Sequence, residues 1–126
     1  GCDILVGVHI RQTDYKNFSN GKYYFETDQY FDIMEKVEGL FPNMKVKFLV
    51  CSDTKQNKTI FLGFNYSFGS GHIIEDMYSL AKCDYIVGVP STFSMWASFY
   101  GKVPLYMIEN LDASILLEDF KVISGK

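Results

Sequence analysis

The chain has 126 residues, of which 48% are hydrophobic and 17% aromatic, so it is long enough to bury the core of a single domain. Its formal net charge is −3 without a long basic run, which argues against a nucleic-acid-binding or anionic membrane-binding surface, because such surfaces need clustered lysine and arginine. The spacing of Cys2, Cys51 and Cys83 is not that of a metal site, and their odd number argues against a disulfide framework.

The first predicted strand, residues 3–10, is almost continuously apolar, which is typical of a strand covered on both faces in a parallel sheet. A polar cluster and a turn-rich loop at residues 16–22 follow it. Residues 26–41 then show the spacing of an amphipathic helix, capped by Thr27 or Asp28. Its predicted core positions are Tyr30, Met34, Val37 and Phe41.

A second buried strand is predicted at residues 46–51, ending in a polar corner that contains Asp53. Residues 55–62 form a weak helical pattern, and residues 65–68 a short strand. Residues 75–82 are helical in pattern, with Met77, Tyr78, Leu80 and Ala81 available to the core.

The stretch from residue 84 to residue 108 reads as strand, helix and parallel strand, which is a right-handed βαβ unit. Pro90 stops the strand at residues 84–89, and Ser91 or Thr92 can cap a helix at residues 93–100 that ends at Gly101. We expect Phe93, Trp96 and Phe99 to lie in the core, residues 103–108 to form the next strand, and residues 112–119 to form a terminal helix.

The alternation of strands and helices predicts an α/β domain with an open, mostly parallel sheet flanked by helices. Ligands of such sheets bind beyond the carboxyl ends of the strands, where Arg11, Asp53 and the hydroxyls of Ser91, Thr92 and Ser94 are expected to meet. No GxGxxG follows the first strand and no GxxxxGK[ST] occurs, which argues against a dinucleotide oxidoreductase and a P-loop nucleotidase.

Two interpretations remain open for each candidate residue. The helix start with Ser91, Thr92 and Ser94 suits a phosphate, or it is only a capping sequence. Arg11 can bind a phosphate through two N–H groups, or it forms an ion pair with Asp14. The other candidates have simpler alternatives: His9 as a core histidine, Asp76 as a partner of the helix dipole, and Glu26, Asp28 and Asp53 as bases by residue type only.

Two segments resemble the signatures of the alpha-1,2-fucosyltransferase family. Residues 9–15, HIRQTDY, are similar to its HxRRxDY motif. Residues 76–97, DMYSLAKCDYIVGVPSTFSMWA, are similar to its second motif, roughly DLYLLSxCDxxIxxxSTFSxWA. Two motifs in the right order are more specific than either alone. The likeness covers most of this chain but only the donor-binding half of such an enzyme.

The resemblance implies a Rossmann-like C-terminal domain of a GT-B enzyme, in which residues 1–126 are one nucleotide-sugar-binding domain and a fragment of a two-domain protein. The implied reaction is metal-independent, inverting fucosyl transfer from GDP-fucose to a glycan acceptor, without a cofactor. It implies that Arg11 binds the β-phosphate and is catalytic, that His9 seats the nucleotide, and that Asp76 accepts hydrogen bonds from guanine. Ser91, Thr92 and Ser94 would meet the phosphates, and Asp14 would brace the arginine loop.

Three departures from the family pattern stand out. Gln12 and Thr13 replace the usual arginine and glycine, so one positive charge at the donor would be missing. Met95 replaces a tryptophan. Related protein fucosyltransferases carry a glutamate base where this chain has Ser19, so we assign no base.

The leading hypothesis is therefore the donor-binding domain of a transferase that decorates a bacterial surface glycan, with a missing N-terminal domain as partner. The isolated domain would be inactive. We expect a cytoplasmic location, in solution or peripheral at the inner face of the membrane, because no signal peptide or membrane span is recognisable. The alternatives are a catalytically inactive module that binds GDP or a sugar nucleotide, and an unrelated flavodoxin-like regulator.

Overall fold

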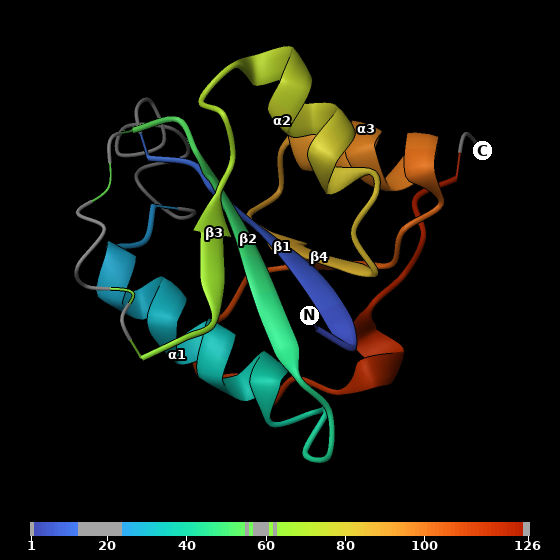
Figure 1. Ribbon diagram of the computed structural model, residues 1–126. Coiled ribbons are helices and arrows are strands. Elements are labelled where there is room, and N and C mark those ends of the chain that lie inside the picture. The colour runs from blue at the N-terminus through green and yellow to red at the C-terminus, as the bar shows by residue number, and fades with distance from the viewer. Residues whose placement is uncertain (1, 13–23, 55, 57–60, 62, 125–126) are drawn as a thin grey trace.

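The computed structural model describes residues 2–12, 24–54, 56, 61 and 63–124, which form a sheet between two layers of helices (Figure 1). The sheet has the strand order β3-β2-β1-β4-β5, and each strand runs parallel to its neighbour. This confirms the predicted α/β fold with an open parallel sheet. The strands are β1 (Ile4–Ile10), β2 (Val46–Ser52), β3 (Tyr66–Phe68), β4 (Tyr85–Gly88) and β5 (Leu105–Met107).

The strand order places a topological switch point between β1 and β4, because the chain first builds outward through β2 and β3 and then returns to the other side of β1. Helix α1 (Thr27–Glu38) covers one face of the sheet, and helices α2 (Ile73–Leu80) and α3 (Thr92–Gly101) cover the other (Figure 1). Ligands of doubly wound sheets bind at the carboxyl edge of such a switch point.

Alternation along the strands divides the core into two clusters. Val6, Val8 and Ile10 pack with α1 in the larger cluster, in which Tyr30 and Met34 are fully buried. The smaller cluster lies on the opposite face and contains Cys51, Leu80, Ile86, Phe93, Ala97 and Leu105. Odd-numbered positions of β1 and β2 therefore face α2 and α3.

The predicted core positions are confirmed, since Tyr30, Met34 and Val37 of α1 and Phe41 shortly after it are all buried. The N-cap of α1 is Glu26 rather than Thr27 or Asp28. The Glu26 backbone N–H donates to the Gln29 side chain at 2.7 Å, which forms one arm of a capping box.

The predicted terminal helix at residues 112–119 is wrong. The structure has only a 3₁₀ turn, η3 (Leu117–Asp119), followed by Lys121. Lys121 forms an antiparallel bridge with Leu105, in which each backbone N–H donates to the other residue's carbonyl. An extended segment can satisfy the backbone groups of the edge strand β5, which a helix could not do.

The expectation that Trp96 and Phe99 lie in the core is also wrong, because they are 36% and 50% exposed. Helix α3 buries Phe93, Ser94, Ala97 and Ser98, so the positions between them face outward. The Trp96 ring stacks on Tyr100 at 4.7 Å and meets Tyr78 edge-on. Tyr78, another predicted core position, is thus exposed as well.

No helix in the described part of the chain combines the length and apolar character needed to cross a membrane. The predicted loop at residues 16–22 lies outside the described residues, and so does most of the weak helical pattern at residues 55–62.

Candidate functional site

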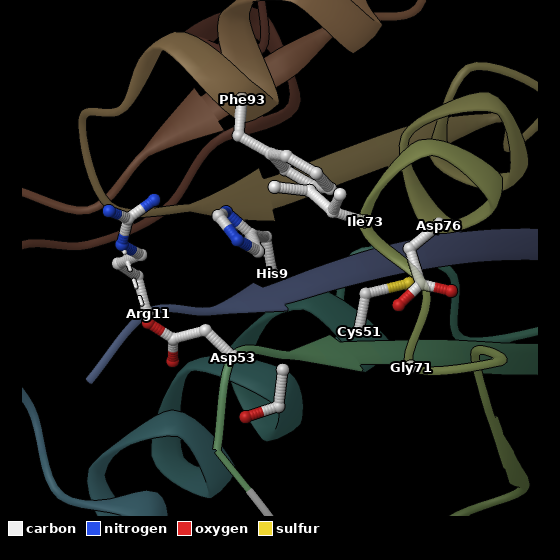
Figure 2. A pocket seen from close by; sticks show the side chains of 9 residues that line it. His9, Arg11, Cys51, Asp53, Gly71, Ile73, Asp76 and Phe93 are labelled. Atoms are coloured by element: carbon white, nitrogen blue, oxygen red, sulfur yellow. Dashed lines mark ion pairs between the residues drawn. The ribbon is translucent and has the colours of Figure 1, made fainter. Parts of the chain in front are cut away.

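A recess of about 90 Å³ lies beyond the carboxyl ends of β1 and β2, at the edge where the switch point was expected to place a ligand (Figure 2). The recess is open on one side and is formed by β1, β2, the turn before α2, and the two helices α2 and α3. It is lined by His9, Arg11, Cys51, Ser52, Asp53, Gly71, Ile73, Asp76 and Phe93.

Strand alternation explains why His9 and Arg11 share this recess. Both are odd-numbered residues at the end of β1, so their side chains leave the face that α2 and α3 cover. Gly88 is the register partner of His9 in β4. A Cβ at Gly88 would lie 3.2 Å from the Cβ of His9, so the glycine leaves room for the histidine beside β4.

His9 forms a wall of the recess and is only 4% exposed. Its ring stacks on Phe93 with a centroid distance of 4.4 Å, and its Nδ1 has no hydrogen-bond partner among the described residues. Burial lowers the pKa of His9 to about 4, an effect that nearby Asp53 partly opposes. The imidazole is therefore neutral at pH 7, with one buried nitrogen that a ligand could satisfy.

Arg11 is held by Asp53 from the neighbouring strand end. The Arg11 Nε lies 3.4 Å from Asp53 Oδ2, with side chains that are 29% and 24% exposed. Asp53 Oδ1 also accepts a hydrogen bond from the Gln12 backbone N–H at 2.8 Å. Asp14, the partner that the sequence suggested, lies outside the described residues, so its bracing role stays a prediction.

Asp76 is buried in the first turn of α2, with an exposed fraction of 5%. Its Oδ1 accepts hydrogen bonds from the Ser70 backbone N–H at 2.9 Å and from the Ser70 hydroxyl at 3.3 Å, which ties the turn before α2 to the helix. A second hollow of about 290 Å³ shares Ser52, Gly71 and Asp76 with the recess. Asp76 thus belongs to a wall common to both hollows.

The structure does not bring Ser91, Thr92 and Ser94 into the recess. Ser91 is the N-cap of α3, and its hydroxyl oxygen accepts the Ser94 backbone N–H at 3.2 Å. The buried Ser94 hydroxyl lies 3.2 Å from the Ser91 hydroxyl, and Thr92 lines a separate, mostly apolar groove beside Trp96. The capping interpretation describes the contacts of Ser91 and Ser94, and their contact with a phosphate stays a prediction.

Gln12 does not line the recess, and the inference that its neutral side chain removes a charge from the donor site stays a prediction. Its amide nitrogen donates to the Phe25 carbonyl at 3.0 Å, and its amide oxygen accepts from the Thr54 hydroxyl at 2.9 Å. Even-numbered positions of β1 face α1, and Gln12 continues that pattern. An arginine at this position would start from the same face.

Two of the three candidate bases are engaged in structural contacts. Glu26 caps α1, and Asp53 pairs with Arg11. Cys51 also lines the recess, but burial raises its pKa, so it is an uncharged thiol at neutral pH. Within the described residues, no group of three or more His, Cys, Asp or Glu side chains has the arrangement of a metal site.

Sequence reasoning missed Phe93 as a site residue because aromatic residues on a helix between two strands are usually core. It also missed Ile73 and Gly71, which lie in and before the first turn of α2. The Gly-Ser-Gly run at residues 69–71 was a usable signal, since it marks a turn beside the buried carboxylate of Asp76.

Comparison with known proteins gives a match to a family model and matches to solved structures. The model of the family described as Glycosyl transferase family 11 matches residues 3–115, which is most of the chain. No curated protein matches. A solved structure of FUT1 from Arabidopsis thaliana, an arginine-to-lysine mutant in complex with GDP, is similar in fold, with a TM-score of 0.56 and 17% sequence identity.

That match covers 95% of this chain but 32% of the plant protein's chain, so the chain spans about a third of its length. The structural likeness shows the fold, and the family match shows the membership. Both agree with the resemblance seen in the two sequence motifs. This chain belongs to glycosyltransferase family 11.

Proposed function

We propose that this chain is the donor-binding domain of a fucosyltransferase-like enzyme that transfers fucose from GDP-fucose to a glycan hydroxyl with inversion. The observation that carries this proposal is the recess at the carboxyl edge of the sheet, where Arg11, His9 and Asp76 meet. All three belong to the motifs that resemble the family signatures. The GDP complex of the plant protein supports a GDP-linked donor.

Fucosyl transfer from GDP-fucose requires stabilisation of the leaving diphosphate. Glycosyl transfer passes through an oxocarbenium-like state, in which the sugar gains positive charge and the departing GDP gains negative charge. The Arg11 guanidinium and the backbone N–H groups of the first turn of α3 are donors suited to that charge, each worth on the order of 3 kcal/mol. Phe93, near the start of α3, lines the recess, which places this helix end beside it.

The size of the recess supports a site completed by another domain. Its volume of about 90 Å³ is far below the roughly 300 to 1,000 Å³ of most small-molecule sites. The chain also spans about a third of the plant protein. We therefore propose that the acceptor, and part of the donor, bind to a second domain that completes a GT-B arrangement.

The proposed donor is tested by calorimetric titration of the protein with GDP, with UDP and guanosine as comparison ligands. We expect GDP to bind, UDP to bind more weakly, and a hundredfold excess of GDP over its dissociation constant to stabilise the fold by about 2.7 kcal/mol. Arg11→Ala should abolish most of the GDP binding. Lys82→Ala, which removes an exposed charge outside the recess, is the matched control and should leave binding unchanged.

An inactive GDP-binding module is the second candidate function. It is favoured because both carboxylates that line the recess already make structural contacts and neither is placed as a base. Asp53 pairs with Arg11, and Asp76 holds the turn before α2. Full-length protein given GDP-fucose and a panel of glycan acceptors separates the two candidates. Release of GDP supports the transferase, whereas GDP binding without release supports the module.

A further inference from the structure

The carboxylate of Asp53 holds two consecutive residues of the segment that follows β1. Its Oδ1 accepts the Gln12 backbone N–H at 2.8 Å, and its Oδ2 lies 3.4 Å from the Arg11 Nε. The Asp53 backbone N–H also donates to the Ile10 carbonyl at 3.2 Å. Asp53 is therefore tied to the backbone of the segment on both sides of Arg11 as well as to its side chain.

Asp53 contacts the Arg11 guanidinium on its Nε side. Figure 2 shows Asp53 beside the Nε and the terminal nitrogens pointing away from it, toward the side of the recess where Phe93 and α3 lie. A guanidinium binds a phosphate best through two parallel N–H groups, so its plane must be set before the ligand arrives. An ion pair at Nε restricts the rotation of that plane while the terminal nitrogens point toward the α3 side of the recess.

Asp53 is well placed for this role because it comes from a different strand than Arg11. The two strands are joined by a continuous parallel register from Ile4 with Val46 to Ile10 with Ser52. Asp53 follows immediately after this register ends, so its backbone has little freedom relative to β1. A freely rotating arginine, in contrast, would lose conformational entropy when it bound an anion.

We infer that Asp53 is a positioning residue, which orients the Arg11 guanidinium toward the diphosphate of the donor and does not itself touch the reacting atoms. The inference rests on the proposed function and deepens it. It also assigns a role to a carboxylate that residue type alone would have offered as a base.

The direction in which one substitution changes GDP affinity separates this inference from a simple charge effect. Asp53→Asn keeps an oxygen that can accept the Gln12 N–H but removes the negative charge. If Asp53 were only a neighbouring anion, its removal would strengthen GDP binding by relieving repulsion. If it orients Arg11, Asp53→Asn should weaken GDP binding by about tenfold, because misplacement of a binding group is costly. Guanosine, which lacks the diphosphate, should bind equally well to both proteins.

Asp84→Asn is the matched control. Asp84 also uses a carboxylate oxygen to accept a backbone N–H of β1, that of Leu5 at 2.8 Å, but it precedes β4 and does not line the recess. Asp84→Asn should leave GDP affinity unchanged. A double-mutant cycle completes the set: in an Arg11→Ala background, Asp53→Asn should cause no further loss of GDP affinity.

A second measurement needs no ligand. Arg11 is the only arginine in the sequence, so the Nε–H signal of arginine in a ¹⁵N-labelled sample belongs to one residue. In the wild type we expect this signal to exchange slowly with water. In Asp53→Asn it should shift and exchange faster, whereas Asp84→Asn should leave it unchanged.

The outcomes distinguish this inference from the proposed function. If the wild type binds no GDP, the proposed function fails, and an orienting role toward a diphosphate fails with it. If the wild type binds GDP but Asp53→Asn binds it equally well or more tightly, the proposed function stands and the inference is overturned. An unchanged Arg11 signal in Asp53→Asn overturns it as well, whatever the ligand results.

Discussion

Arg11 and Gln12 are adjacent in the chain, but their side chains lie on opposite faces of the sheet. Arg11 enters the recess on the side of α2 and α3, whereas Gln12 hydrogen-bonds to Phe25 and Thr27 at the start of α1. The two residues therefore perform different tasks. Arg11 lines the recess, and Gln12 joins the ends of β1 and β2 to the start of α1.

This separation predicts the effect of replacing Gln12. Gln12→Leu should destabilise the fold by about 1 to 3 kcal/mol, because the part-buried Thr54 hydroxyl and Gln56 amide lose their shared acceptor. GDP affinity should change less than twofold in Gln12→Arg, since the new charge starts from the face opposite the recess. Urea denaturation and calorimetry measure the two effects. A large gain in GDP affinity for Gln12→Arg would show that position 12 reaches the donor.

Burial of His9 predicts a pH-dependent stability. The folded pKa of about 4 lies below the usual 6.5, so the unfolded chain binds more protons between these values. The contribution of neutral His9 to the free energy of unfolding is complete above pH 6.5. It is lost as the pH falls toward 4, by an amount on the order of 3 kcal/mol. Urea denaturation of the wild type and His9→Gln at pH 7 and pH 4.5 should show a smaller change in the variant. His72→Gln, at an exposed position, should behave like the wild type.

Close packing around Gly69 predicts a selective effect on Asp76, the carboxylate that the family resemblance makes a candidate for binding guanine. A Cβ at this position would lie 2.5 Å from Asp76 Oδ1 and 2.9 Å from the Cys51 sulfur. Gly69→Ala should cost about 1 to 3 kcal/mol of stability and displace the Asp76 carboxylate. We expect weaker binding of GDP and unchanged binding of pyrophosphate, measured by calorimetry. Gly63→Ala is the control, because nothing lies within 4 Å of its Cβ.

Because Ser91 caps the N-terminus of α3, we expect its replacement to lower the stability of the fold. Ser91→Ala should reduce the free energy of unfolding by about 1 kcal/mol through loss of the bond from the Ser94 N–H. Ser91→Thr keeps a hydroxyl and should recover most of that loss. Calorimetry on the same variants decides between the two interpretations of the motif. If Ser91→Ala lost GDP affinity more than tenfold at equal stability, its hydroxyl would have to meet the phosphate directly.

Much of the fold follows from local pattern. The continuous apolar runs before Arg11 and Asp53 predicted two buried parallel strands, and the spacing of Tyr30, Met34 and Val37 predicted the buried face of α1. These features depend on the periods of strands and helices, which are properties of consecutive residues. The same patterns correctly placed Arg11 and His9 at a carboxyl edge of the sheet.

Features that depend on contact between distant segments were not predictable. The contact of Arg11 with Asp53 is one such feature, because the parallel register brings the end of β2 beside the end of β1. The exposed face of α3 was missed for a similar reason. Composition shows that Trp96 and Phe99 are apolar, but only the crossing of α3 over the sheet decides which side is buried.

The sequence by itself determined the type of fold, the positions of its strands, and the sheet edge at which the recess lies, because these depend on short-range periodicity and on motifs. The tertiary structure decided which side chains share the recess. It set Asp53 against Arg11, turned Gln12 toward α1, and used the hydroxyl of Ser91 to cap α3. Such choices depend on sheet register and helix packing, which juxtapose residues far apart in the chain.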